Sequence, residues 1–362
     1  MKKRDFLKSG LYAAGGLGLV SSNAVLAACG QKAPAGGAAA PVYLHGGKVN
    51  KREKVLAVLD QSKPNEYVPA AFFMHFKEKL GQGAINRHLE YFRATNMDFA
   101  KIQYEIVLPR LTNINRPEDW EKIPVYDKEF FAPQLEVIGA LAKELKSEAL
   151  ILPTVYSPFS LAGQLMGEGF ITHARENPDA VAKGFAHITE SILNYIREAV
   201  NLGADGFYIS SQGGEAANFG ESPLFDQLTV PFDTAILQES SDKALLNILH
   251  ICDYGNTYNR LDKFISYPGS IINPPIRLAD GSDVKTKDVQ ERFRRPVLGG
   301  LDRLGVISTG SPEEIKKDVD KVLAEAAPNF ILGADCTISG ETSWQTIRSV
   351  IDYAHDWRST HA

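Results

Sequence analysis

Cysteine is scarce in this sequence, with only 3 among 362 residues, which is too few for a disulfide framework. An excess of positive charge is also missing, because 39 Lys and Arg face 44 Asp and Glu, for a net charge of −5. No basic run stands out in the body of the chain, so we expect no nucleic-acid partner. The remaining composition, 44% hydrophobic and 23% charged, is typical of a globular protein and excludes a mainly disordered, collagen-like or coiled-coil chain.

The first 28 residues have the pattern of an export signal. A basic start, MKKRDFLK, precedes apolar and small residues that are too interrupted by Gly, Ser and Asn for a membrane span. The segment ends in LAAC, which resembles a bacterial lipobox, so residues 1–28 are expected to be a signal peptide and Cys29 the lipidated N-terminus. Within the basic start, KRDFLK resembles a twin-arginine (Tat) export signal in which Lys3 replaces the first arginine.

Residues 29–50 are rich in Gly, Ala and Pro and show almost no periodicity, which predicts a flexible linker. No later stretch approaches the roughly 18 consecutive apolar residues of a membrane-spanning helix. We therefore expect an exported lipoprotein of the cell envelope that contacts the membrane only through a lipid anchor on Cys29. Its folded body is expected at residues 51–362.

The body alternates between strand and helix patterns. Amphipathic segments separate eight short apolar segments, and eight strand–helix units predict an α/β fold, a single (β/α)₈ TIM barrel. Ser311, Pro312 and Glu314 form a helix-start signal, and the last helix is expected at residues 343–357. The eight expected strands are residues 68–75, 98–105, 149–155, 206–211, 245–252, 269–273, 296–300 and 330–336.

A doubly wound open sheet is the alternative fold. It normally carries a Gly-rich phosphate-binding turn after its first strand, and that turn is missing from this sequence. The pair Gly213-Gly214 follows the fourth expected strand instead. The barrel is therefore the favoured prediction.

Polar residues occur where the expected strands end, which is where barrels of this type place their chemistry. Glu105 and His75 are the candidate catalytic residues, although each is also compatible with a purely structural role at a strand end. The candidate residues for contact with a small-molecule substrate are Tyr104, Tyr156 and Gln212.

His250 and Cys252 stand two residues apart at the end of an extended run, so strand alternation would point both side chains to one face. Cys336 ends the eighth expected strand. Two thiolates and one imidazole suit zinc and leave a fourth position open, as in catalytic zinc sites. The alternatives are two ordinary buried cysteines or a disulfide between Cys252 and Cys336.

Several motifs together resemble the uroporphyrinogen decarboxylase (URO-D) superfamily over residues 50–358. They are LHICDYGN, RPVLGGLDR, SPEEIKKDVDKVL and FILGADCTI, with DFAKIQYE and GADGFYISSQ in the middle strands. The resemblance implies a (β/α)₈ barrel from one of two branches, the cofactor-free decarboxylases of haem synthesis or zinc-dependent methyltransferases. The second branch moves methyl groups between a corrinoid protein and a thiol, and its HxC…C zinc motif matches His250, Cys252 and Cys336.

One departure argues against the decarboxylase branch. That branch carries an Arg-rich segment after its first strand to bind substrate carboxylates, whereas this chain has VPAAFFMHFKEKLGQG, which lacks Arg. The resemblance thus implies a zinc-dependent methyltransferase that activates a thiol for methyl transfer from a corrinoid-type donor. The alternatives are a cofactor-free decarboxylase of a uroporphyrinogen-like substrate and a non-catalytic envelope lipoprotein that binds a corrinoid or tetrapyrrole.

Overall fold

The structure is a computed structural model that describes residues 49–103, 107–167 and 169–361. These residues belong to one compact unit, Lys48–Ala362. The expected signal peptide, Cys29 and nearly all of the expected linker lie outside the described residues, as do Tyr104 and Glu105.

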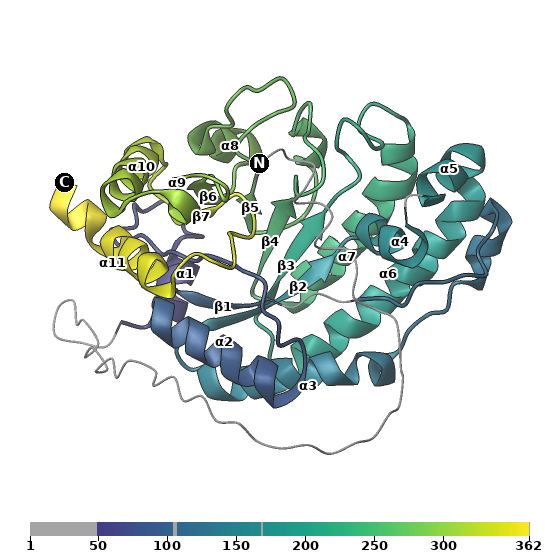
Figure 1. Cartoon of the computed structure of the whole chain (residues 1–362), viewed down its shortest axis with the longest axis horizontal. Coiled ribbons are helices and arrows are strands. Elements are labelled where there is room, and N and C mark those ends of the chain that lie inside the picture. Colours follow the sequence, from purple (N-terminus) through teal and green to yellow (C-terminus); the bar gives the residue numbers. More distant parts are fainter. Residues whose placement is uncertain (1–48, 104–106, 168, 362) are drawn as a thin grey trace, which may run out of the picture. The chain divides into compact units, whose positions relative to one another are not determined.

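A single parallel sheet forms the centre of the unit (Figure 1). In the described part of the chain it has seven strands, which lie side by side in the order in which they occur in the sequence. Each strand therefore pairs with its neighbours in sequence, and all their carboxyl ends lie at one edge of the sheet. The strands are β1 (Phe99–Ile102), β2 (Leu150–Tyr156), β3 (Gly206–Ser211), β4 (Leu246–Ile251), β5 (Ile271–Asn273), β6 (Val297–Leu301) and β7 (Phe330–Ala334).

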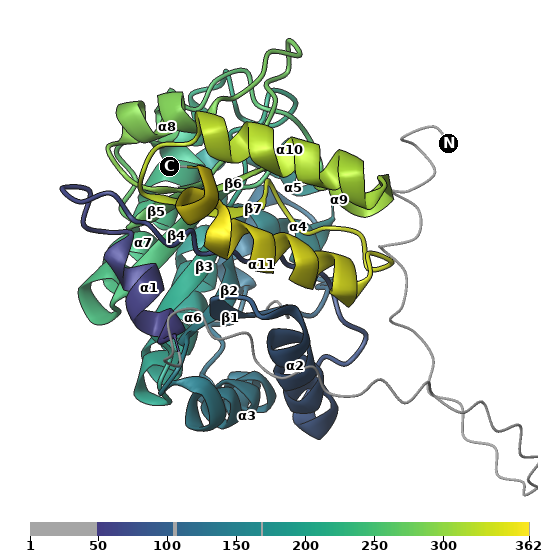
Figure 2. The same ribbon diagram turned by 90° about the vertical axis from the view of Figure 1, so that its left-hand side faces the viewer.

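Helices connect most of the successive strands and lie around the curled sheet (Figures 1 and 2). The helices between β1 and β4 are α3 (Lys128–Leu145), α4 (Pro158–Met166), α5 (Gly169–Glu176), α6 (Pro178–Asn201) and α7 (Val230–Lys243). After β5 come α8 (Thr286–Phe293), α9 (Val306–Thr309), α10 (Pro312–Glu325) and α11 (Trp344–His361), and α1 (Lys51–Ala57) and α2 (Gly81–Thr95) precede β1. Short helical turns cover Pro117–Lys122, Phe225–Thr229 and Asp262–Phe264.

The expected strand at residues 68–75 is wrong as a regular strand. The segment makes a single isolated bridge, in which Ala70 pairs in parallel with Leu332 of β7. On its other side, the Ala70 carbonyl accepts a hydrogen bond of 3.1 Å from the backbone N–H of Asp98, directly before β1. An extended segment thus lies between β7 and β1, where the first of the eight strands was expected.

The local sequence explains why this segment does not form a regular ladder. Pro69 has no N–H to donate, which restricts its pairing in a sheet. The N–H of Ala70 donates instead to the side chain of Asp98, at 2.7 Å from Oδ2. Side-chain bonding thus replaces part of the backbone pairing that a regular strand at this place would need.

The helix start predicted at Ser311 is confirmed. The Ser311 hydroxyl accepts a hydrogen bond from the backbone N–H of Glu314, and the Glu314 carboxylate accepts one from the N–H of Ser311. The last helix, α11, continues to His361, beyond the expected end at residue 357. The second expected strand is shorter than predicted, because β1 ends at Ile102.

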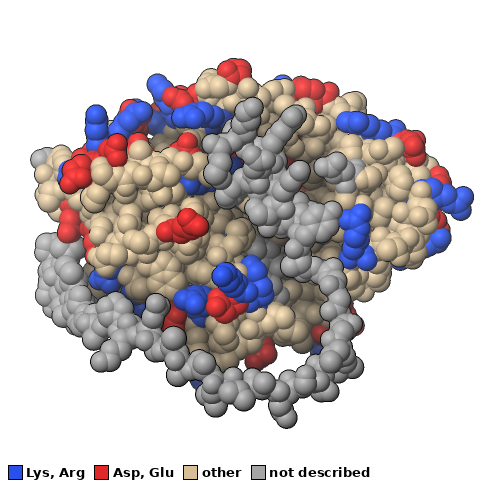
Figure 3. Space-filling model, in the orientation of Figure 1, with Lys and Arg blue, Asp and Glu red and all other residues tan. Residues whose placement is uncertain are grey.

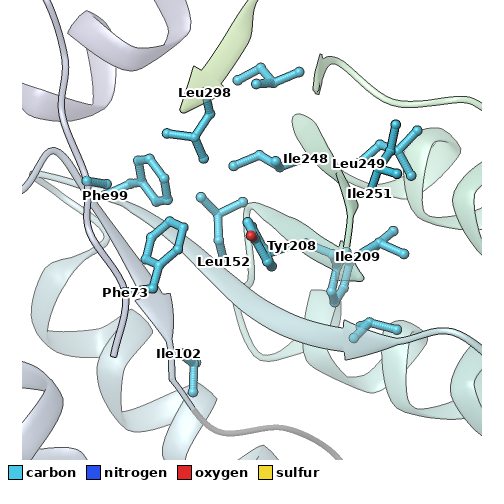
Figure 4. Close-up of a cluster of buried hydrophobic side chains, with 14 of the residues drawn as sticks. Phe73, Phe99, Ile102, Leu152, Tyr208, Ile209, Ile248, Leu249, Ile251 and Leu298 are labelled. Atoms are coloured by element: carbon cyan, nitrogen blue, oxygen red, sulfur yellow. The ribbon is translucent and has the colours of Figure 1, made fainter. Parts of the chain in front are cut away.

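Strand alternation separates two sets of apolar side chains. In Figure 4, Phe73, Phe99 and Tyr208 cluster with Ile248 and Leu298 on one side of the strands. Leu249 and Ile251 lie on the opposite side of β4, and all of these side chains are buried. Because His250 follows Ile248 at an interval of two residues, it faces the inside of the curled sheet.

Charged side chains of both signs are interspersed on the face shown in Figure 3, without a large area of one sign. Within the described ranges, none of the helices combines the length and the apolar composition that a membrane crossing requires.

Candidate metal centre

The carboxyl ends of two strands bring together the three residues that the sequence singled out. His250 is the fifth residue of β4, Cys252 directly follows that strand, and Cys336 lies two residues after β7. Their possible ligand atoms all lie within 4.8 Å of one another. The side chains are buried, with relative exposures of 1% for His250 and 6% for each cysteine.

Neighbouring residues hold the His250 ring on two sides. Its Nδ1 lies 3.3 Å from the backbone carbonyl oxygen of Asn273, and the Tyr208 ring stacks on it at a centroid distance of 4.9 Å. The Tyr208 hydroxyl in turn donates to the Asn273 side chain at 2.5 Å. In a neutral ring, donation from Nδ1 to this carbonyl leaves the lone pair on Nε2.

The Nε2 atom of His250 is buried and has no hydrogen-bond partner. A buried polar atom normally finds a partner, so this nitrogen needs an explanation. Metal-bound histidines commonly donate one ring N–H to a carbonyl and offer the other nitrogen to the ion. The arrangement of His250, together with two adjacent sulfur atoms, therefore fits a metal ligand set.

Cys252 and Cys336 are free rather than joined in a disulfide. A hydrogen bond with Cys252 lowers the pKa of the Cys336 thiol, and His250 and Arg303 act in the same direction. The same hydrogen bond, together with burial, raises the pKa of Cys252. A bound cation would favour ionisation of both sulfur atoms.

Arg303 contacts one residue next to each cysteine in the sequence. Its Nη1 lies 2.6 Å from Asp253 Oδ1 and 2.5 Å from Asp335 Oδ2. Burial raises the pKa of Asp335 to about 7, and the Arg303 charge acts in the opposite direction. The sequence reading did not select Arg303, because its partners lie 50 and 32 residues away along the chain.

Of the other candidate residues, the structure describes His75, Tyr156 and Gln212. His75 is exposed, and Tyr156 is half-buried at the end of β2. The Gln212 side chain accepts a hydrogen bond of 2.5 Å from Ser160 at the start of α4. Among the described residues, the group of possible ligands therefore contains His250 and the two cysteines only.

Two buried polar residues of the sheet interior were missed by the sequence reading. The Lys101 ammonium group lies 4.7 Å from the centre of the Tyr208 ring and donates to Gln103 Oε1 at 3.2 Å. The Nε2 atom of Gln103 is buried without a hydrogen-bond partner. A lysine inside an otherwise apolar strand, FAKI, was the signal that could have revealed this pair.

The structure combines a curled parallel sheet with a His-Cys-Cys group at its carboxyl edge. Both features were expected from the family that the sequence resembles. The family model described as "Uroporphyrinogen decarboxylase (URO-D)" matches residues 93–357, and the chain belongs to this family. The family resemblance noted in the sequence is thereby confirmed.

Individual relatives point to one branch of the family. The chain is 23% identical over 250 residues to the methylcobamide:CoM methyltransferase MtbA of Methanosarcina mazei, an alignment that covers 68% of this chain and 70% of the relative. It is 22% identical over 249 residues to the MtbA of Methanosarcina acetivorans, with the same coverage. A solved structure of a methyltransferase from Methanosarcina mazei superimposes with a TM-score of 0.70 at 16% identity, covering 87% of this chain and 100% of that one. This likeness shows that the two proteins share a fold.

Proposed function

We propose that this protein is a zinc-dependent methyltransferase in which His250, Cys252 and Cys336 hold the metal. Two observations on His250 carry the proposal. Its buried Nε2 has no hydrogen-bond partner, and its ligand nitrogen lies within 4.8 Å of two free cysteine sulfurs. Two sulfur ligands and one nitrogen ligand favour zinc over magnesium or calcium. Three protein ligands leave a fourth position for a substrate, as catalytic zinc sites require.

The substrate that we propose for the fourth position is a small thiol. Zinc, when bound, lowers the pKa of a coordinated thiol, so that a thiolate is available at neutral pH. Asn273 and Tyr208 orient His250 for this ligand set, and burial of all three ligands excludes water from their side of the site. Lys101 and Gln103, next to Tyr208, offer polar contacts to the substrate.

In the proposed reaction the thiolate sulfur forms a bond to a methyl carbon carried by a corrinoid-type donor. The bond between that carbon and the donor breaks, its electron pair stays with the donor, and the thiol proton leaves to a base. We propose Glu105 or His75 as the base and Tyr104, Tyr156 and Gln212 as contacts to the substrate. Glu105 is also a possible fourth ligand in the resting site.

The envelope location belongs to the proposal as well. We propose that residues 1–28 are removed on export and that Cys29 carries the lipid anchor of the mature protein. Export of the folded, metal-loaded chain by the Tat route would reconcile a zinc site with this location.

The experiment that tests the reaction uses the full-length protein, loaded with zinc and mixed with methylcobalamin and a small thiol. We expect loss of the methyl–cobalt absorbance together with formation of the methyl thioether, detected by mass spectrometry. Cys336→Ser should abolish both signals, whereas Cys29→Ser, the same substitution outside the proposed ligand set, should retain them. Equal turnover by the wild type and Cys336→Ser would contradict the proposal.

The same preparation discriminates the two alternatives. Release of carbon dioxide from uroporphyrinogen without added zinc would indicate the decarboxylase. Binding of a corrinoid or tetrapyrrole without turnover, unchanged in His250→Ala, would indicate the non-catalytic lipoprotein. We place both second, because neither gives the cysteine pair and the unpartnered His250 nitrogen a chemical role.

A further inference from the structure

We infer that Arg303 is a positioning residue that sets the spacing between the two cysteine ligands. The inference rests on the proposed zinc site for its functional meaning, but its structural basis is independent of the metal. One guanidinium group joins the two chain segments that carry Cys252 and Cys336. The same nitrogen, Nη1 of Arg303, contacts a carboxylate in each segment.

The sheet alone does not fix the distance between these segments. Cys252 follows β4 and Cys336 follows β7, and two strands, β5 and β6, lie between them. Hydrogen bonds of the sheet join each strand only to its direct neighbours, and β5 pairs with β6 at one position in the register, Ile272 to Val297. The backbone therefore connects the ends of β4 and β7 only through two intervening strands, and the pairing between those two strands is short.

Arg303 supplies a short connection across the same gap. It follows β6, and its Nη1 lies 2.6 Å from Asp253 Oδ1, in the residue directly after Cys252. The same nitrogen lies 2.5 Å from Asp335 Oδ2, in the residue directly before Cys336. Each cysteine is thus one residue away from a carboxylate that the same guanidinium group holds.

A third contact fixes Arg303 itself. Its backbone N–H donates to Asp335 Oδ1 at 2.7 Å, so Asp335 binds both the main chain and the side chain of Arg303. The guanidinium carbon also lies 5.8 Å from the centre of the Tyr254 ring. Arg303 and Asp335 are buried, and buried charge-assisted hydrogen bonds are stronger and better ordered than exposed ion pairs.

The positive charge of Arg303 has a second role, which is to balance negative charge near the proposed metal site. Asp253 and Asp335 place two carboxylates beside two sulfur ligands, and the Arg303 cation offsets part of this negative charge. Loss of the guanidinium group would leave the carboxylates without their partner and free to move toward a bound metal ion. Both effects predict a looser and less selective ligand set.

The test compares Arg303→Met and Arg303→Lys with Arg295→Met in the full-length protein. Arg295 is a matched control, because it also bridges chain segments, donating to the backbone carbonyls of Tyr267, Gly269 and Ile265, away from the cysteines. Zinc affinity is measured by competition with a chromophoric chelator, and ligand geometry by the absorption spectrum of the cobalt-substituted protein. Arg303→Met should weaken zinc binding by about 10- to 100-fold and alter the cobalt spectrum. Arg303→Lys should lie between it and the wild type, and Arg295→Met should bind zinc like the wild type.

A measurement without metal separates this inference from the proposed function. In the metal-free protein, amide hydrogen exchange should become faster around residues 252–254 and 335–337 in Arg303→Met but not in Arg295→Met. Unchanged exchange and zinc affinity in Arg303→Met, or equal losses in Arg295→Met, would overturn the role of Arg303. Absence of zinc from the wild type would overturn the proposed function instead, and the exchange data would still decide the role of Arg303. If Arg303→Met fails to fold, the same comparison is made with Arg303→Lys.

Discussion

His250 is prepared for its proposed role by neighbours that leave one ring atom unused. The Asn273 carbonyl lies at hydrogen-bond distance from Nδ1, and the Tyr208 ring limits rotation of the imidazole. Asn273 is itself fixed, since its side-chain nitrogen donates to the backbone oxygens of Leu298 and Ala334. Residues of four different strands thus determine the direction of one nitrogen lone pair.

Replacing Tyr208 with Phe tests whether the ring or the hydroxyl group supports the site. The ring that stacks on His250 is retained, so we expect the zinc content to stay at the wild-type level. The buried Asn273 Oδ1 loses its donor, which should lower the free energy of unfolding by about 1–2 kcal/mol in a denaturant titration.

The matched control for this substitution is Tyr267→Phe. The Tyr267 hydroxyl is buried without a hydrogen-bond partner, so its removal should leave the free energy of unfolding unchanged or slightly higher. Loss of zinc from Tyr208→Phe would show that the hydroxyl, rather than the ring, supports the metal site.

The sequence revealed the proposed ligands but not the residues around them. His250 and Cys252 were predictable because strand alternation places residues two apart on one face. Cys336 was found because it ends another expected strand. The contacts of Arg303 span 50 and 32 residues and depend on the placement of three strand ends, which no local pattern encodes.

A buried carboxyl group in helix α7 is hydrogen-bonded to strand β3. Ser211, the last residue of β3, donates a hydrogen bond to Asp233 in the first turn of α7. Burial raises the pKa of Asp233 to about 8, against the effect of this hydrogen bond, and nearby Glu215 acts in the same direction as burial. Asp233 is therefore protonated in the folded protein at neutral pH.

A raised carboxyl pKa predicts that folding stability falls as the pH rises. The unfolded chain releases its proton near pH ~3.9, whereas folded Asp233 keeps it to about pH 8. The stabilisation is complete below the first value and is lost as the pH increases through the second. Asp233→Asn should remove this contribution, so that the free energy of unfolding depends less on pH between about 4 and 8.

Denaturant titrations at a series of pH values check this expectation. Asp242→Asn is the control, since Asp242 is exposed on the same helix and accepts a hydrogen bond from Gln238. The control should follow the wild-type pH dependence. An Asp233→Asn profile identical to that of the wild type would show that the carboxyl group is ionised when folded.

Most elements were predictable where local signals agree with the global fold. The amphipathic segments and the capping box at Ser311 predicted helices that the structure contains. The expected strand at residues 68–75 failed because an apolar run indicates burial more reliably than pairing. Its Pro69 lacks a donor, and the neighbouring Ala70 N–H bonds to a side chain that is distant in sequence.

At the scale of the whole molecule, Asp98 connects the beginning of the described chain with its end. It precedes β1 and accepts hydrogen bonds from the Tyr67 hydroxyl at 2.6 Å and the Ala70 N–H at 2.7 Å. Its Oδ2 also lies 2.8 Å from His355 Nε2 in α11. This contact holds the extended segment and the last helix against the first strand of the sheet.

The lowered pKa of Asp98 predicts that the folded protein loses stability in acid. Burial acts to raise the pKa of Asp98, but His355, Lys51 and Tyr67 outweigh it and hold the pKa below its usual value. Such a group stabilises the folded state above its unfolded pKa of about 3.9, and this stabilisation is lost as the pH falls through the folded value. Asp98→Asn should lower the free energy of unfolding at neutral pH by about 3 kcal/mol and reduce the further loss in acid.

Thermal or denaturant unfolding at neutral and acidic pH measures both effects. Asp280→Asn is a suitable control, because Asp280 is exposed and bonds only locally to Ser282. We expect a change of less than about 0.5 kcal/mol in this control. Equal stability of Asp98→Asn and the wild type would show that the Asp98 contacts do not hold the fold together.

The central claim, that His250, Cys252 and Cys336 bind one zinc ion, is tested most directly by elemental analysis of the purified full-length protein. The wild type, Cys252→Ser, Cys336→Ser and the control Cys29→Ser are compared under reducing, metal-replete conditions. The account predicts about one zinc per chain in the wild type and in Cys29→Ser, and loss of zinc from both other variants. A wild type without zinc, or zinc retained in both Cys252→Ser and Cys336→Ser, would contradict it.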